Sequence, residues 1–166
     1  MFSGTLPGNI GRLKKLSVLN ASDNNLKALP KTIHKATELE SCVVSNNKIK
    51  RLPKNIGAAP NLVDLNCSNN SLKALPKSIY RLQKSLDASG NMIDTLPNIV
   101  ITKKSKGNIS QINLSNNRLC TLPEDINKLQ RLTDINVQNN ELEYLPTGNY
   151  CTLLSIRPYS HQLTKY

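Results

Sequence analysis

The sequence predicts a solenoid of stacked repeats in which each unit supplies one short strand and one outer segment. The dipeptide Leu-Pro recurs at 6–7, 29–30, 52–53, 75–76, 96–97, 122–123 and 145–146, in steps of 21 to 26 residues. Seven of the nine prolines belong to this series. An Asn recurs in phase with it, and apolar residues alternate with polar ones just before that Asn. A period of this length is the signature of a repeat array.

Six units follow the pattern L-x-x-L-x-L-x-x-N-x-L-x-x-L-P, with Ile, Val, Ala or Cys replacing Leu at some positions and Gln83 in the first position of the fourth unit. The recurring Asn residues are Asn24, Asn47, Asn70, Asn91, Asn117 and Asn140. The L-x-L segment alternates as a strand does, and one unit cannot bury its apolar face alone, so neighbouring units must stack. An Asn at each turn can satisfy buried backbone groups, which predicts that these side chains lie in one column.

The outer segments carry apolar residues three positions apart, which predicts a short helix or a 3-10 turn against the strands. These pairs are Ile10 and Leu13, Ile33 and Ala36, Ile56 and Ala59, Ile79 and Leu82, and Ile126 and Leu129. The fourth unit lacks two residues before Leu86, and the fifth gains three around residues 102–107. We expect the insertion to form a mobile basic loop.

This pattern resembles the leucine-rich repeat in its 23-residue Leu-Pro form, over residues 6–146. The resemblance implies an α/β solenoid with a parallel β-sheet on the concave face and short helical or 3-10 segments on the convex face. Similar repeats occur in intracellular scaffold proteins of the Ras-signalling class and in effectors that bacteria inject into host cells. We expect an array of about six units over residues 1–146 and an irregular cap or tail over 147–166.

The four cysteines indicate a reducing compartment. Cys42 and Cys67 fall at inward positions, where a thiol behaves as a small apolar residue, and the paired-Cys flanking caps of secreted repeat proteins are missing. The start of the chain has no secretory signal, and no apolar run approaches the roughly 18 residues of a membrane span. These observations favour the cytoplasm, or the host cytosol for an injected effector.

The residues that could carry catalysis are not arranged for it. The two histidines, His34 and His161, lie in no pattern with a nucleophile and an acid. The sequence contains no metal-ligand spacing, phosphate-binding glycine loop or dinucleotide fingerprint. We therefore expect a protein that is not an enzyme and that uses no cofactor and no metal.

Strand residues that point outward predict a binding face for another protein. This face has no Lys or Arg, and its composition fits either a merely soluble strand surface or a binding interface, which would be wet and hydrogen-bonded rather than apolar. The expected partner-binding residues are Asn20, Asp23, Asp64, Asn66, Asp87, Gln111, Asn113, Asp134 and Asn136. Three of them, Asn20, Asn66 and Asn113, also head N-x-S triplets, the pattern of glycosylation acceptors, which we attribute to chance in an Asn-rich and Ser-rich repeat.

The positive charge lies elsewhere and gives the main alternative. The net charge is +11, and six lysines fall at two repeat positions, Lys27, Lys50 and Lys73 at one and Lys31, Lys54 and Lys77 at the other. Such a basic ridge is either a solvated surface or a dock for an anionic membrane or an acidic protein. Scarce aromatics disfavour nucleic acid. A further alternative is the recognition fragment of a larger enzyme or bacterial effector; the partner's identity and the oligomeric state stay open.

Overall fold

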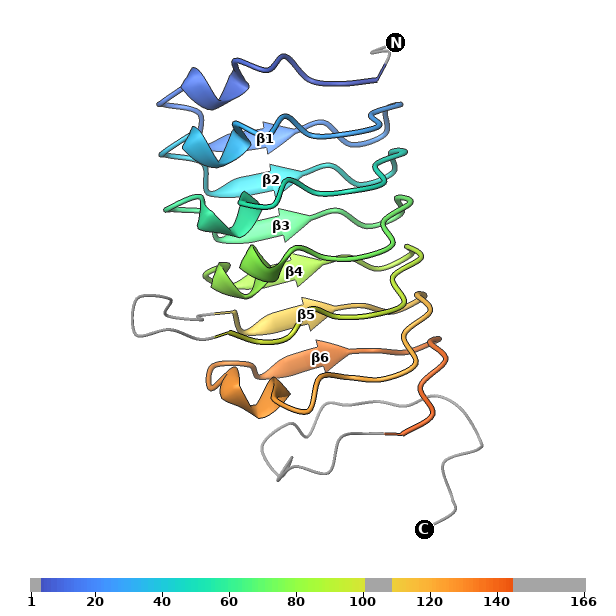
Figure 1. The fold of residues 1–166 in the computed structure, drawn as a ribbon. Helices are drawn as coiled ribbons and strands as arrows, with labels where there is room; N and C mark the ends of the chain where they lie inside the picture. Colours follow the sequence, from blue (N-terminus) through green and yellow to red (C-terminus); the bar gives the residue numbers. More distant parts are fainter. Residues whose placement is uncertain (1–3, 101–108, 145–166) are drawn as a thin grey trace.

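The described residues, 4–100 and 109–144 of the computed structural model, form one parallel sheet in the order β1-β2-β3-β4-β5-β6 (Figure 1). Its strands are β1 (Val18–Asn20), β2 (Ser41–Val43), β3 (Asp64–Asn66), β4 (Ser85–Asp87), β5 (Gln111–Asn113) and β6 (Asp134–Asn136). Each strand pairs in parallel with the next one along the chain, at equivalent repeat positions. The predicted solenoid is confirmed.

Short 3-10 segments form the other layer, as the spacing of the outer apolar pairs predicted (Figure 1). They are η1 (Ile10–Arg12), η2 (Ile33–Lys35), η3 (Ile56–Ala58), η4 (Lys77–Arg81) and η5 (Ile126–Lys128). Each begins just after a Leu-Pro, where proline fixes φ and its carbonyl accepts the first N–H. In η3, for example, the Ile56 N–H donates to the Pro53 carbonyl at 3.1 Å.

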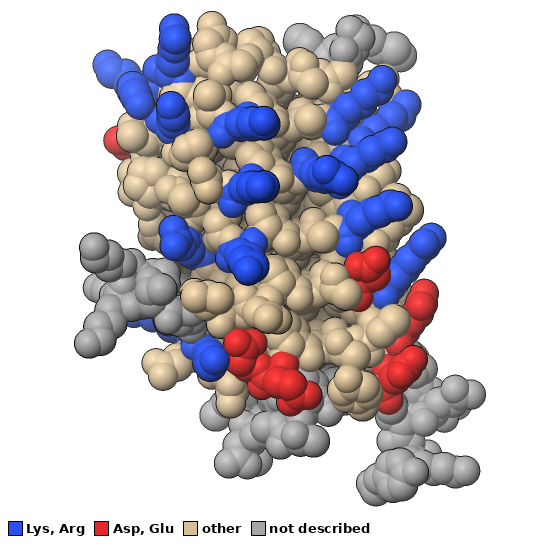
Figure 2. Space-filling model, viewed as in Figure 1, with Lys and Arg blue, Asp and Glu red and all other residues tan. Residues whose placement is uncertain are grey.

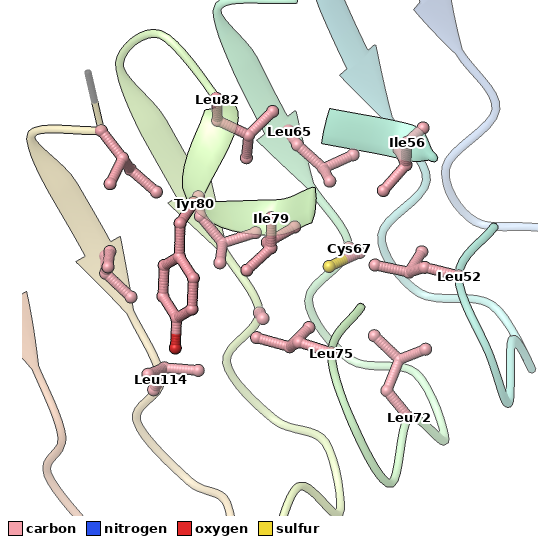
Figure 3. Packing of buried hydrophobic residues seen from close by; sticks show 14 of the residues in the cluster. Leu52, Ile56, Leu65, Cys67, Leu72, Leu75, Ile79, Tyr80, Leu82 and Leu114 are labelled. Carbon is pink, nitrogen blue, oxygen red and sulfur yellow. The ribbon is translucent and has the colours of Figure 1, made fainter. Parts of the chain in front are cut away.

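The core lies between the two layers, and each unit contributes a few apolar side chains to it. Figure 3 shows Ile56 and Ile79 of consecutive outer segments pointing into it beside Leu65 and Cys67. Cys42 and Cys67 are buried free thiols, and burial raises the pKa of Cys42 to about 12. Burial, with a smaller contribution from the neighbouring Cys42, raises the pKa of Cys67 as well. Both thiols therefore act as apolar core residues, as predicted.

One expected core position is wrong. Leu13, paired in the sequence with Ile10, has a side chain 54% exposed, whereas the second members of the other four pairs are buried. Leu13 follows the first outer segment, η1, which no strand precedes among the described residues.

The Asn side chains that end each turn form the predicted column. The Nδ2 atom of Asn47 donates to the carbonyls of Val44 and Ser45 in its own unit, at 3.1 and 3.0 Å. It also donates to the Ala21 carbonyl of the preceding unit at 2.9 Å, while its Oδ1 accepts the Leu26 N–H at 2.8 Å. The same contacts recur up to Asn140, so each Asn from Asn47 onward links two units, whereas among the described residues Asn24 bonds only within its own unit.

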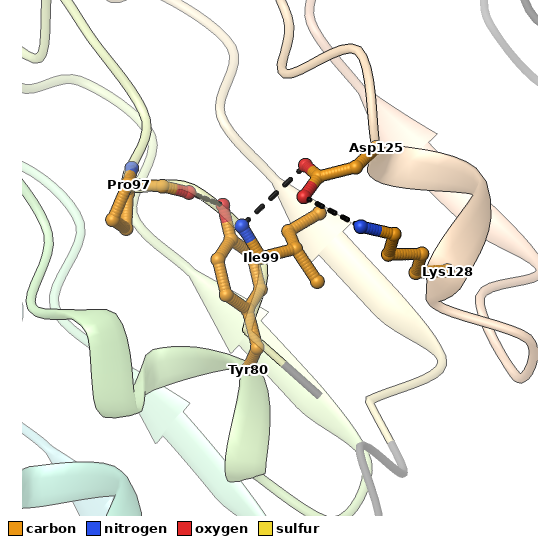
Figure 4. Close-up of polar contacts among 5 residues, drawn as sticks. All are labelled: Tyr80, Pro97, Ile99, Asp125 and Lys128. Carbon is orange, nitrogen blue, oxygen red and sulfur yellow. Dashed lines mark hydrogen bonds and ion pairs between the residues drawn. The ribbon is translucent and has the colours of Figure 1, made fainter. Parts of the chain in front are cut away.

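The break in the period is filled by an aromatic side chain. Tyr80, in η4, is buried where residues 97–100 have no 3-10 segment, and its hydroxyl donates to the Pro97 carbonyl at 3.0 Å (Figure 4). The Ile99 N–H donates to Asp125 Oδ1 at 3.4 Å, and Lys128 pairs with the other oxygen at 3.4 Å. Burial, with a smaller contribution from Asp125, raises the pKa of Tyr80. The Tyr80 ring thus packs where residues 97–100 form no 3-10 segment.

Several expectations lie outside the described residues. They are the basic loop at 102–107, the cap or tail at 147–166, and the roles of Cys151 and His161. The division into an array and a tail therefore stays a prediction. Within the described part of the chain, no helix has the length and apolar character to cross a membrane.

Candidate binding face on the parallel sheet

Two columns of outward side chains run across the sheet. The first column contains Val18, Ser41, Asp64, Ser85, Gln111 and Asp134, and the second contains Asn20, Val43, Asn66, Asp87, Asn113 and Asn136. From β2 to β6 they line a hollow of about 450 Å³. We call the two columns and this hollow the strand face.

The hollow gathers most of the residues that the sequence predicted for binding. Asp64, Asn66, Asp87, Gln111, Asn113, Asp134 and Asn136 all line it. Asn20 and Asp23 do not, because they lie at the first strand and its turn, beyond the hollow. Ser41, Val43 and Ser85 line it without having been predicted, although they hold the same repeat positions as the predicted residues. Their repeat position alone would therefore have been enough to predict these three residues.

In the first column, the side chains remain largely available. Ser85 Oγ donates to Asp64 Oδ1, which joins β4 to β3 through their side chains. Gln111 and Asp134 are exposed, and their side chains make no hydrogen bond with another described residue. The composition of this column also changes from unit to unit. The first column can therefore present a different side chain to a binding partner at each strand.

In the second column, one oxygen of each polar side chain is used by the fold. Asn66 Oδ1 accepts the backbone N–H and the hydroxyl of Ser68, at 3.0 and 2.8 Å. Asp87 does the same with Ser89, at 3.0 and 2.7 Å. The equivalent pairs are Asn20 with Ser22 and Asn113 with Ser115. This Asx-type turn ends the strand. The N-x-S triplets thus have a structural reason, and our attribution of them to chance was incomplete.

Asp23 has a turn role of its own. Its backbone lies in the left-handed region, with φ 56°, a conformation that Asn and Asp tolerate better than other non-glycine residues. Its Oδ1 atom accepts a hydrogen bond from Asn46 Nδ2 at 2.8 Å. Asn46, Asn69, Asn116 and Asn139 share this backbone conformation, and Gly90 takes the place in the fourth unit. This column shapes the edge of the strand face.

The hollow is acidic and its carboxylates lack cationic partners. Asp64, Asp87 and Asp134 line it, and the described residues hold one ion pair, which lies elsewhere, between Lys128 and Asp125. No cluster of three or more His, Cys, Asp or Glu residues suited to a metal ion occurs in residues 4–100 and 109–144. The chemistry on offer is hydrogen bonding and attraction of cations.

The predicted basic positions also lie in columns along the solenoid, and the charge of the residues at these positions changes from positive to negative toward the C-terminus. Lys50 lies beside Lys27, its N–H donating to the Lys27 carbonyl at 3.5 Å, and Asp94 follows Lys73 in the same column, with its N–H 3.4 Å from the Lys73 carbonyl. We call the two series beginning at Lys27 and Lys31 the Lys columns. Figure 2 shows Lys and Arg over the N-terminal units of this face and Asp and Glu over the C-terminal ones.

Comparison with known proteins agrees with this architecture. Residues 108–129 match the family model for the Leucine Rich Repeat. YopM from Yersinia enterocolitica is similar in structure, with a TM-score of 0.63 and 28% identity over 84% of this chain. The leucine-rich-repeat domain of a Shigella effector has a TM-score of 0.63 and 25% identity over 87% of this chain. The chain is a leucine-rich-repeat protein. It resembles bacterial effectors.

This leucine-rich-repeat protein is also similar to the ectodomain of the plant membrane receptor kinase GASSHO1/SCHENGEN3 from Arabidopsis thaliana, with a TM-score of 0.65 and 29% identity over 86% of this chain. It spans 28% of the YopM chain, 17% of the plant ectodomain and 63% of the Shigella domain. No curated protein sequence matches it.

Proposed function

We propose that this chain binds another protein through its strand face. The leucine-rich-repeat fold is generally a protein–protein interaction module, and the plant ectodomain was solved in complex with CASPARIAN STRIP INTEGRITY FACTOR 2. The proposal depends above all on the hollow of about 450 Å³ that β2 to β6 line with polar side chains. The second column is tied to the turns, whereas the first column varies, and variation on a rigid scaffold is how binding surfaces become selective.

The chemistry of the strand face suggests the character of the partner. Asp64, Asp87 and Asp134 have no ion-pair partner among the described residues, so they favour a partner that presents Lys or Arg side chains. Gln111 and Asn113 offer hydrogen bonds, and Val43 is one of four apolar residues in the lining. We expect a wet interface with bridging water, because most of the lining is polar.

The test neutralises the three carboxylates while keeping their shape. In Asp64→Asn/Asp87→Asn/Asp134→Asn, the fold should survive because Asn already occupies the Asp87 position in other units. The control is Asp94→Asn/Glu124→Gln/Glu141→Gln, which removes as many charges outside the hollow. Quantitative affinity capture from candidate native and host lysates should recover a partner with the wild type and the control, and lose it with the first variant. Equal recovery by all three proteins would refute the assignment of the strand face.

A photo-crosslinker localises the same contact. Benzoylphenylalanine at Gln111, which is exposed inside the hollow, should crosslink to the captured partner. The same group at Lys77, in a Lys column, should not. A partner that crosslinks from Lys77 alone would instead support the electrostatic alternative, in which the Lys columns dock an acidic protein or an anionic membrane.

We further propose that the chain binds without catalysing a reaction and that it works in a reducing compartment, the cytoplasm or a host cytosol. The free thiols Cys42, Cys67 and Cys120 support the compartment. The recognition fragment of a larger enzyme or effector stays an alternative, since the chain spans only part of the three similar chains named above. The sequence of the complete gene distinguishes it.

A further inference from the structure

A second hollow of about 450 Å³ lies where two successive outer segments begin. Buried Leu29, Leu52 and Pro53 line its floor, and exposed Lys31, Arg51 and Lys54 line its rim. We call it the cationic groove. An apolar floor with a charged rim differs from the strand face, where acidic and amide groups line the hollow.

One irregular repeat position lies at the groove. Thr5, Ala28, Arg51, Ala74 and Thr95 occupy equivalent places, and parallel bridges join Thr5 to Ala28 and Ala74 to Thr95. Arg51 is the cation in this series. Its neighbour in the preceding unit, Ala28, is small and lines the groove, which leaves space beside the guanidinium.

The cations of the groove have no internal counter-charge. None of the three belongs to the ion pair that the described residues contain. Residues 4–84 carry 14 Lys and Arg against 4 Asp and Glu, whereas the described residues from 85 to 144 carry 3 against 7. Like charges on neighbouring units repel one another, so a bound anion would relieve that repulsion.

We propose that the cationic groove binds an acidic segment of another protein, with an apolar side chain on the Leu29–Leu52–Pro53 floor and carboxylates against Lys31, Arg51 and Lys54. A planar bilayer fits less well, because a groove does not protrude and the large exposed apolar residues, Leu13, Val18, Val100 and Tyr144, lie outside it. The Lys columns also change to Asp94 and Glu124 in later units, which an anionic bilayer would repel. No aromatic side chain lines the groove to stack on a base.

Binding of a defined peptide tests the proposal without knowledge of the natural partner. The probe is a fluorescein-labelled peptide, Gly-Glu-Asp-Leu-Asp-Glu-Gly, followed by fluorescence anisotropy. One companion peptide replaces Leu with Ala, and another replaces every acid with its amide. We expect the acidic Leu peptide to bind several-fold more tightly than either companion. Equal binding of the Leu and Ala peptides would overturn the groove, because charge alone would then explain the binding.

Variants of the chain test whether the peptide binds in the cationic groove. Arg51→Ala should weaken binding roughly fivefold, as loss of one charge-assisted contact does, and it should fold because Ala28 and Ala74 hold the same position. Arg81→Ala removes an equal charge outside the groove and should change binding by less than about twofold. Ala28→Tyr, which fills the groove, should abolish the preference for Leu. Equal loss in the Arg51 and Arg81 variants would overturn the proposal.

A vesicle-binding experiment distinguishes a protein ligand from a lipid surface. Vesicles of phosphatidylserine and phosphatidylcholine should not sediment more wild-type chain than the Arg51→Ala variant. Arg51-dependent sedimentation with no peptide binding would overturn the proposal in favour of a membrane dock. The result is independent of the strand face, because its three Asp→Asn changes leave the cationic groove intact.

Discussion

Among single residues, the Asn that closes each turn makes the most polar contacts. Asn91 donates to the carbonyls of Cys67, Ala88 and Ser89 and accepts the Leu72 N–H, all at 3.0 to 3.1 Å. Its side chain is buried, and two of these partners belong to the preceding unit. A buried backbone group that loses its partner is costly, so this residue stabilises both the turn and the stacking.

Replacement of this Asn should destabilise the array. Asn91→Ala leaves one N–H and several carbonyls without their partner, and we expect a loss of about 3 kcal/mol in the free energy of unfolding. Urea denaturation followed by circular dichroism measures it. Asn61→Ala is the matched control, because exposed Asn61 makes a single hydrogen bond, to the Thr37 carbonyl. Similar losses in the two variants would contradict the role given to the Asn column.

Among the elements, the 3-10 segments set how closely the units approach on the outer side. Gly57, inside η3, is buried against the backbone of η4, and a Cβ there would overlap the Ser78 carbonyl. Gly11 meets the Thr32 carbonyl in the same way. Tyr80 holds the corresponding position in η4, where no 3-10 segment follows in residues 97–100 and the ring finds space. Close approach of the next outer segment therefore requires Gly at positions 11 and 57, whereas His34 occupies the same position in η2.

A single methyl group at Gly57 should separate two outer segments. We expect Gly57→Ala to lower the free energy of unfolding by about 2 kcal/mol, because the backbone it meets cannot rotate away. Gly8→Ala is the control, since a Cβ at that position meets nothing within 4 Å. Thermal unfolding of both variants measures the difference in stability. An unchanged Gly57→Ala protein would show that η3 and η4 are not in tight contact.

The elements show how far sequence reasoning reaches. The strand register and the Asn column followed from period and polarity, because a stack of near-identical units allows few alternatives. The Asx-type turns at Asn66 and Asp87 were missed, since an N-x-S triplet does not reveal which oxygen accepts the Ser68 or Ser89 groups. The groove beside Arg51 was missed for a related reason. It depends on the small size of Ala28 one unit away, which a pattern of apolar positions does not record.

Across the whole molecule, charge is distributed unevenly along the axis. The N-terminal units are basic and the described C-terminal units are acidic (Figure 2), and the strand face carries carboxylates. With strands ~4.8 Å apart, each lysine of a column lies within a screening length of its neighbours. This arrangement lowers stability slightly and leaves the chain with two chemically distinct surfaces.

Reversal of one charge in a column should stabilise the fold. Lys50 lies between Lys27 and Lys73, so Lys50→Glu converts two repulsions into attractions and should add about 0.5 kcal/mol at low salt. The gain should disappear near ~0.5 M salt, where exposed charges are screened. Lys15→Glu, an exposed change outside the columns, serves as the control. Chemical denaturation at the two salt concentrations provides the measurement, and a salt-independent gain would point to a cause other than charge.

The tie between each polar second-column side chain and its turn has a consequence for how such an array can diversify. The residues that end the strands and the residues that would select a partner lie at different positions. A substitution at Gln111 or Asp134 therefore changes the surface offered to a partner and leaves the strand ends in place. Randomising the six first-column sites would therefore yield a library whose members share one scaffold and differ in what they bind.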